Sequence, residues 1–336
     1  PRATTTTTKA RPDPDGIVIE GGTVEMKDST VTAGSGSAVS FIHASGTSAG
    51  TASVSGGSLA SGTGAAITSS VFAIDDVSRP EIRLSNGVQV AGKDQELVFV
   101  KSGGGDRGGS LKVVADNVQL AGNMRARWTP SSFDDAVLHV ELLNGSALQG
   151  VIEHGRSVMV DGTSQWTLSG NSDVLGTLTS AGALAFAAPA SGDFKTLTVG
   201  GDYIGNGGSL TVNTALADDA SQTDKLIVKG STSGDTTLRV NNVGGAGAPP
   251  VDGIQVVQVD GASNGTFALG DRVVAGAHEY RLAQGGVTNP GDGDWYLRSQ
   301  AMPDPAPVPT PAPTPDPTPA PEPTPGPLPA PAPAPP

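Results

Sequence analysis

An internal repeat near the start of the chain places the strongest constraint on its fold. Residues 30–40 (TVTAGSGSAVS) align with residues 58–68 (SLASGTGAAIT) at an offset of 28, and glycines and apolar positions match. The apolar register continues every 28 to 30 residues, through the positions Val31, Leu59, Val88, Val118 and Leu148. A solenoid must bring each strand back above the previous one after a roughly fixed number of residues, and this spacing therefore favours a solenoid.

Strand signals alternate with turn signals over residues 17–189. Short Val, Ile and Leu runs are separated by clusters of Gly, Ser, Asn and Asp. The chain has 47 Gly and only 4% aromatic residues. Such a composition has too few large side chains to fill a wide core. We therefore predict an all-β fold, a single-stranded parallel β-helix over residues 16–190. The alternative is an array of antiparallel β-sandwiches, for which the Gly and Ser content is high and the aromatic content low.

One segment, residues 131–143 (SSFDDAVLHVELL), has both helical and strand character. Phe133, Val137, Val140 and Leu143 fall near helical spacing, but residues 137–142 alternate equally well as a strand. We favour the strand.

Charge and composition exclude several classes of function. The formal net charge of −13 disfavours nucleic acid as a partner and tight docking on anionic lipid. The absence of cysteine excludes disulfides, thiol nucleophiles and cysteine-ligated metals. No run of about 18 apolar residues exists, so no membrane helix is expected. Because the chain begins at Pro1 without Met or a signal peptide, we expect a mature or excised fragment.

Both ends of the chain have the composition of unpacked segments. Residues 1–15 combine a Thr run with alternating Pro and Asp, and they predict a flexible lead-in. Residues 301–336 are almost entirely Pro, Ala and Thr, and they predict a disordered, proline-rich linker with polyproline II character.

The C-terminal half resembles a known family. The resemblance is carried by an ordered set of segments, namely 165–178 (QWTLSGNSDVLGTL), 183–186 (ALAF), 194–199 (FKTLTV), 207–214 (GGSLTVNT), 224–228 (DKLIV), 280–282 (YRL) and 295–297 (WYL). Over residues 160–300 this set resembles the C-terminal passenger region of pertactin-like autotransporters of the Bordetella type. Residues before 160 match that family only in general character.

The resemblance implies a right-handed parallel β-helix that is exported through a C-terminal outer-membrane barrel, which this chain lacks. It also implies that residues 191–300 act as an autochaperone, a region that folds first and templates the remaining coils. Five aromatic residues in this third of the chain are consistent with a thicker, better-buried cap: Tyr203, Phe267, Tyr280, Trp295 and Tyr296.

Three motif matches suggest enzymes or nucleotide sites, but each lacks its structural context. Residues 46–50 fit the G-x-S-x-G elbow, which needs a strand, a turn and a helix. Residues 87–93 resemble a Walker loop, but Asp94 stands where a metal-binding hydroxyl is needed, and a strand and turn are expected instead. Residues 103–108 satisfy G-x-G-x-x-G with no helix behind them, which favours an exposed loop.

No metal site or cofactor is expected. The four histidines, His43, His139, His154 and His278, have no ligand spacing and are assigned to the surface or to turns. Asp292 and Asp294 lie in a sequence compatible with weak calcium binding, but an ordinary turn is favoured. We therefore assign no catalytic, cofactor-binding or metal-binding residue, and the sequence does not identify binding residues. No Arg-Gly-Asp tripeptide is present.

Two hypotheses of function come from different classes. The first is a non-enzymatic adhesin or virulence factor displayed on the bacterial outer membrane, or secreted through the periplasm, that binds a host cell-surface or serum protein as a monomer. The second is the non-catalytic stem of an exported hydrolase whose catalytic domain lies upstream. A serum-protein-binding factor of immune evasion is a variant of the first. Besides the host ligand, the expected partner is the protein's own C-terminal barrel.

Overall fold

The computed structural model describes residues 15–42, 49–71, 79–101, 108–127, 136–190 and 192–301, together with Gly326. Two compact units divide at Met302 and Pro303, and all strands belong to the first unit. The expected lead-in lies outside the described residues except for Asp15. Apart from Gly326 and residue 301, the proline-rich linker also lies outside them.

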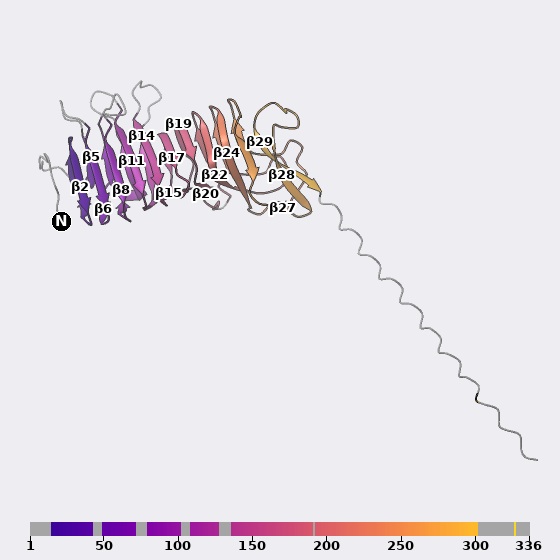
Figure 1. Cartoon of the computed structure of the whole chain (residues 1–336), viewed down its shortest axis with the longest axis horizontal. Helices are drawn as coiled ribbons and strands as arrows, with labels where there is room; N and C mark the ends of the chain where they lie inside the picture. The colour runs from indigo at the N-terminus through magenta and orange to yellow at the C-terminus, as the bar shows by residue number, and fades with distance from the viewer. Residues whose placement is uncertain are drawn as a thin grey trace, which may run out of the picture. The chain divides into compact units, whose positions relative to one another are not determined.

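Up to β26, the strands of this unit repeat around three faces and pair in parallel with the strand one coil earlier (Figure 1). The first face holds β1 (Ile17–Ile19), β4 (Val39–Phe41), β7 (Ile67–Ser69), β10 (Glu96–Val100), β13 (Asn123–Ala126) and β16 (Ile152–Glu153). The second face holds β2 (Thr23–Lys27), β5 (Thr51–Ser55), β8 (Glu81–Ser85), β11 (Ser110–Asp116), β14 (Val137–Leu143) and β17 (Gly155–Val160). The third face holds β3 (Thr30–Ala33), β6 (Ser58–Ser61), β9 (Gln89–Ala91), β12 (Gln119–Ala121), β15 (Ala147–Gly150), β18 (Gln165–Leu168) and β20 (Ala183–Phe186).

Beyond residue 170 the coils continue through long strands that turn a corner. The start of β19 (Ser172–Ser180) pairs with β21 (Thr196–Val199), which is followed by β23 (Lys225–Val228) and β25 (Ile254–Val259) on the first face. Two further strands, β22 (Tyr203–Thr214) and β24 (Thr232–Asn242), pair along both the second and third faces, and β26 (Thr266–Leu269) follows β24. The predicted parallel β-helix is confirmed.

The core is a set of stacked aliphatic columns along the solenoid. Inward side chains of successive coils lie directly above one another, because side chains alternate between the two sides of each strand. On the first face the column is fully buried, and it comprises Val39, Ile67, Val98, Met124 and Ile152. Stacking these columns removes apolar surface from water without requiring large aromatic residues.

The corner between the second and third faces is built from residues in the left-handed conformation. Asp28, Asn86, Asn117 and Asn144 have φ between 47° and 55°, and Gly56 has φ of 69°. Asn and Asp tolerate this region better than other residues with a side chain, and glycine enters it freely. Glycine alone therefore does not form this corner, since Asn or Asp stands at most of these stacked positions.

The register confirms the repeat in part. Thr30 pairs with Ser58 and Val31 with Leu59, as the offset of 28 predicts. The next two predicted positions, Val88 and Val118, were wrong by two residues, since Leu59 pairs with Val90 and Leu148 with Leu120. Val88 and Val118 are buried corner residues that precede β9 and β12.

Two coils are much shorter than the predicted period. The step from Leu148 to Trp166 and the step from Trp166 to Leu184 are each 18 residues. One reason is the corner between β16 and β17, where the single residue His154, with φ of 57°, turns the chain. In earlier coils the sequence between the strands of the same two faces is longer. It includes segments 43–48, 72–78, 102–107 and 128–135, which all lie outside the described residues.

Asp161 holds the turn of a short coil. Its carboxylate accepts hydrogen bonds from the backbone N–H groups of Asn144 (2.6 Å) and Thr163 (2.9 Å) and from the Thr163 hydroxyl (2.8 Å). Burial by itself raises the pKa of this carboxyl, but the hydrogen bonds outweigh it and lower the pKa to about 2.

A lowered pKa makes the contribution of Asp161 to stability dependent on pH. The bonds favour the ionised form, so their contribution is complete above the unfolded-state pKa of about 3.9 and is lost as pH falls toward 2. We expect Asp161→Ala to lower the urea midpoint at pH 5 and to differ little from wild type at pH 2. A difference that stays the same at both values of pH would contradict this assignment.

The ambiguous segment resolves as a strand. Residues 137–143 form β14, which pairs along its length with β11, so the preference for a strand over residues 137–142 is confirmed. Residues 131–135 lie outside the described part of the chain. In the described ranges the only helical element is one 3₁₀ turn, Lys93–Gln95. These ranges therefore contain no helix that is long and apolar enough to cross a bilayer.

Candidate functional site at the junction and the C-terminal cap

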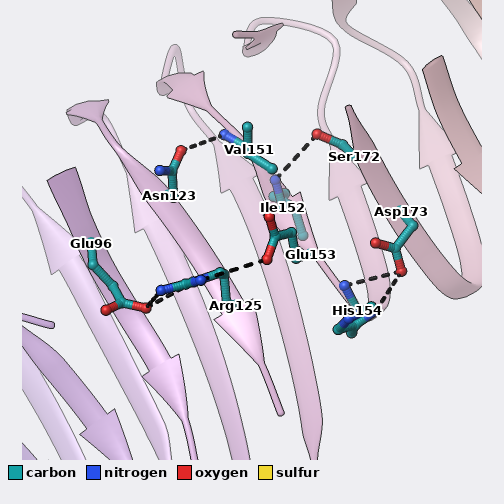
Figure 2. A network of polar contacts seen from close by, with 9 residues as sticks. All are labelled: Glu96, Asn123, Arg125, Val151, Ile152, Glu153, His154, Ser172 and Asp173. Atoms are coloured by element: carbon teal, nitrogen blue, oxygen red, sulfur yellow. Dashed lines mark hydrogen bonds and ion pairs between the residues drawn. The ribbon is translucent and has the colours of Figure 1, made fainter. Parts of the chain in front are cut away.

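A polar ladder runs along the outside of the first face toward the C-terminal coils. Arg125 on β13 lies between Glu96 on β10, which accepts its Nη2 at 2.5 Å, and Glu153 on β16 at 3.8 Å (Figure 2). In the same region Asn123 accepts a hydrogen bond from the backbone N–H of Val151 at 3.0 Å. These bonds join consecutive coils through side chains as well as through the parallel ladder.

The ladder ends in a junction with β19. The hydroxyl of Ser172 accepts the backbone N–H of Ile152 at 3.3 Å. The carboxylate of Asp173 accepts the backbone N–H of His154 at 3.1 Å and lies 2.9 Å from its Nδ1. Figure 2 shows Asp173 directed at this one-residue corner. The first two residues of β19 therefore hold the corner between β16 and β17 in the preceding coil.

Removing the Asp173 carboxylate tests this coupling. We expect Asp173→Ala to lower the stability of the coils before residue 155 by about 1–2 kcal/mol, because it leaves a half-buried N–H without its acceptor. Hydrogen exchange measured at increasing urea concentrations should then show those coils opening before the cap. Asp193→Ala, which removes an exposed carboxylate on a nearby turn, is the matched control. A single unfolding transition at the wild-type midpoint would contradict the coupling.

Beyond the junction, the cap contains a buried polar network. Asp224 is fully buried, and its carboxylate accepts the backbone N–H of Lys195 (2.7 Å), the backbone N–H of Asn213 (2.9 Å) and the Asn213 amide (2.6 Å). Lys195 is also buried, and its ammonium donates to the carbonyl of Ala187 at 2.8 Å. The network therefore joins β22 to the residues that immediately precede β21 and β23.

The cap also contains the aromatic core that the sequence indicated. Phe267 stacks on Tyr203 with ring centroids 5.9 Å apart and meets Trp295 at 5.4 Å. Tyr280 is buried too, and its hydroxyl lies 2.9 Å from the Ala217 carbonyl. Burial raises the pKa of Tyr203 to about 12, although the hydrogen bond between its hydroxyl and that of Thr236 acts in the opposite direction. Tyr296 is only half-buried, so the expected thick cap is confirmed for four of the five aromatic residues.

An antiparallel sheet covers the first face where the parallel coils end. β27 (Val273–Ala275) pairs with β28 (His278–Gln284), and β28 pairs with β29 (Trp295–Ala301). β29 also pairs antiparallel with β25. An open β edge is a template for pairing with another chain, and here β29 occupies the edge of β25 with backbone hydrogen bonds.

The two carboxylates considered for calcium are engaged by protein donors. Asp294 accepts the backbone N–H of Val259 at 2.7 Å and the Gln255 amide at 2.5 Å. Asp292 accepts a hydrogen bond from the hydroxyl of Tyr296 at 2.9 Å. The pKa of Tyr296 is raised mainly by burial and, to a smaller extent, by this bond. In the described ranges no group of three or more His, Asp or Glu side chains is arranged to hold a metal.

The remaining motif residues lie apart from the cap. Gln89–Ala91 form strand β9, and Lys93–Gln95 form the 3₁₀ turn, so the Walker-like segment is the predicted strand and turn. His139 lies on the outer side of β14 with Nδ1 2.6 Å from the Ser157 hydroxyl, rather than in a turn. His154 forms the corner described above, and His278 begins β28. Residues 46–48, residues 103–107 and His43 lie outside the described residues.

The fold and cap together define a class: a parallel β-helix whose final coils carry their own aromatic core, buried polar network and closing antiparallel sheet. Residues 172–282 match the family model of the Autochaperone Domain Type 1. The match begins at the Ser172 and Asp173 junction. The structure extends the cap to β29, beyond the matched residues.

Curated relatives point in the same direction. The chain is 50% identical over 117 residues to the adhesin BmaC autotransporter of Brucella suis, covering 32% of this chain and 3% of that protein. It is 42% identical over 106 residues to the autotransporter adhesin AIDA-I of Escherichia coli, covering 31% and 8%. It is 29% identical over 154 residues to the BrkA autotransporter of Bordetella pertussis, covering 45% and 15%.

These findings confirm the resemblance drawn from the sequence: the chain is an autotransporter passenger fragment that carries an autochaperone domain. The Bordetella relative supports the finer comparison with that genus only loosely. The chain spans less than one sixth of the length of each of these three relatives.

Proposed function

We propose that this chain is part of a surface-displayed, adhesin-type passenger that binds a host surface and has no catalytic activity of its own. Export takes it through the periplasm and the outer membrane, and its partners are a host cell-surface or serum protein and the barrel of its own full-length protein. The proposal is supported by the adhesins among its relatives and by the autochaperone domain.

The observation that carries the proposal is the regularity of the outer surface. Three sheet faces run from coil to coil through the described residues, so the same side-chain rows recur along the solenoid. A rigid, repetitive surface of this kind presents many equivalent contacts to an extended ligand. The cap closes one end of it and supplies the autochaperone function, in which the terminal coils fold first and the earlier coils stack on them.

Binding of the purified full chain to cultured host epithelial cells tests the proposal. We expect saturable binding that unlabelled chain displaces, together with the circular dichroism of a β-rich fold in the same preparation. A folded chain that binds no host cell would contradict the adhesin proposal. That result would favour the alternative in which these coils are only the stem of an exported hydrolase.

A further inference from the structure

The third face differs from the other two in the side chains that it presents to solvent. Its outward positions form two rows in register. The first row is Thr30, Ser58, Gln89, Gln119, Ala147, Gln165, Ala183, Ser209 and Thr237. The second row is Thr32, Ala60, Ala91, Ala121, Gln149, Thr167, Ala185, Thr211 and Arg239. In each row the strand pairing gives the register separately for β3 to β9 and for the strands from β12 onward. These two parts of each row are adjacent because β9 packs beside β12.

Apart from Arg239, these strand positions carry no charge. The first and second faces, in contrast, present charged ladders, such as Lys112 between Glu81 and Glu141 at 3.8 and 3.0 Å. A chain with a net charge of −13 thus keeps the outward strand positions of one face free of charge except at Arg239, while it spreads charge over the other faces. Neutral amide and hydroxyl groups both donate and accept hydrogen bonds, so such a face suits a ligand that is itself neutral and rich in hydroxyls.

A groove of about 360 Å³ lies on this face beside the short coils. It is lined by first-row side chains, by Arg239 of the second row and by the turns that precede the strands, and its lining includes Thr163, Gln165, Ala183, Ser209 and Thr237. The volume is comparable to that of small-molecule sites.

Several groups in the groove are available to a ligand. Within the described part of the chain, the side chains of Gln165, Ser209 and Thr237 make no hydrogen bond to protein. Arg239 is paired with Asp271 at 2.6 Å, which neutralises the one cation in the rows. The methyl group of Ala183 provides a small apolar contact between these polar groups.

We propose that this groove binds a segment of a neutral polysaccharide. Sugar hydroxyl groups would pair with the Gln165 amide and with the hydroxyls of Ser209 and Thr237, while the Ala183 methyl would meet a C–H face of the sugar ring. A neutral glycan is favoured over an acidic one, because the one cation of the groove, Arg239, is already paired with Asp271 and the net charge of −13 repels an acidic ligand. The proposal rests on the proposed adhesin function, since it names a glycan carried by the host surface or by a host glycoprotein as the group that the chain recognises.

Isothermal titration of the full chain with dextran, mannan and galactan oligosaccharides, beside heparin oligosaccharides, tests the proposal. We expect saturable binding of at least one neutral probe and no comparable binding of heparin. Ala183→Glu places a charge in the groove and should weaken binding at least 10-fold. Gln165→Ala should weaken binding several-fold. Ala121→Glu, an exposed position of the same face outside the groove, should leave affinity unchanged.

The cell-binding assay run in parallel separates the two proposals. If wild type and Ala183→Glu bind cells equally and no neutral glycan binds, the glycan proposal is wrong and the adhesin proposal stands. If the chain binds neither cells nor glycans, both fail. Preference for heparin would also overturn the glycan proposal. So would a dimer that Ala183→Glu dissociates without any glycan binding, because the face would then be an interface between two copies.

Discussion

Replacing Asp224 by alanine is expected to reduce the free energy of unfolding by about 3 kcal/mol or more. The carboxylate is fully buried and satisfies two backbone N–H groups and the side-chain amide of Asn213. Without it the two backbone N–H groups remain in the interior with no partner and no access to water, and the side-chain NH₂ of Asn213 keeps only its bonds to the carbonyls of Phe186 and Ala187. Equilibrium unfolding in urea, followed by far-UV circular dichroism, measures the loss.

The control for this prediction is Asp235→Ala, which removes an exposed carboxylate from β24 in the same cap. We expect it to change stability by less than about 0.5 kcal/mol. Asp224→Asn should fall between the two, because the amide oxygen still accepts while its NH₂ faces other donors. Equal stabilities for Asp224→Ala and Asp235→Ala would show that the buried network does not hold the cap together.

Truncating Phe267 to alanine is expected to cost about 3–5 kcal/mol, because it opens a cavity between Tyr203 and Trp295. If the cap templates the solenoid, this loss should also slow refolding of the whole chain. Stopped-flow refolding monitored by tryptophan fluorescence and by circular dichroism measures that rate.

Phe41→Ala is the matched variant at the other end of the described coils. Phe41 is as deeply buried as Phe267, so the deletion removes the same side chain from β4. Coils of a solenoid contact only their neighbours, and we expect this change to destabilise the first coils while leaving the refolding rate of the rest unchanged. If Phe41→Ala slows refolding of the whole chain as much as Phe267→Ala does, the cap has no special role.

Much of the fold followed from the sequence because strand and corner residues recur at a visible period. The offset between residues 30–40 and 58–68 gave the register of two coils correctly. The register then drifted at Val88 and Val118, because each of these buried corner residues precedes its strand and has the same apolar character as the inward strand residue two positions later. The two 18-residue coils broke the period altogether.

The cap was predictable as a region but not in its chemistry. Its aromatic residues stand out in a chain that has few of them, and they were expected to be buried. Nothing in the sequence around Asp224 indicates burial, since it lies outside the strands like most Asp residues in the described part of the chain. The junction was hidden for a similar reason, because Asp173 and His154 meet only when the short coil brings them one above the other.

The most direct test of a templating cap is the order in which the backbone becomes protected during refolding. Pulse-labelling hydrogen exchange with mass spectrometry on the full chain resolves β22, β24 and β25 from β2, β5 and β8. The account predicts that N–H groups of the cap strands are protected first and that protection then spreads toward β2. Protection of β2, β5 and β8 before or together with the cap would contradict it.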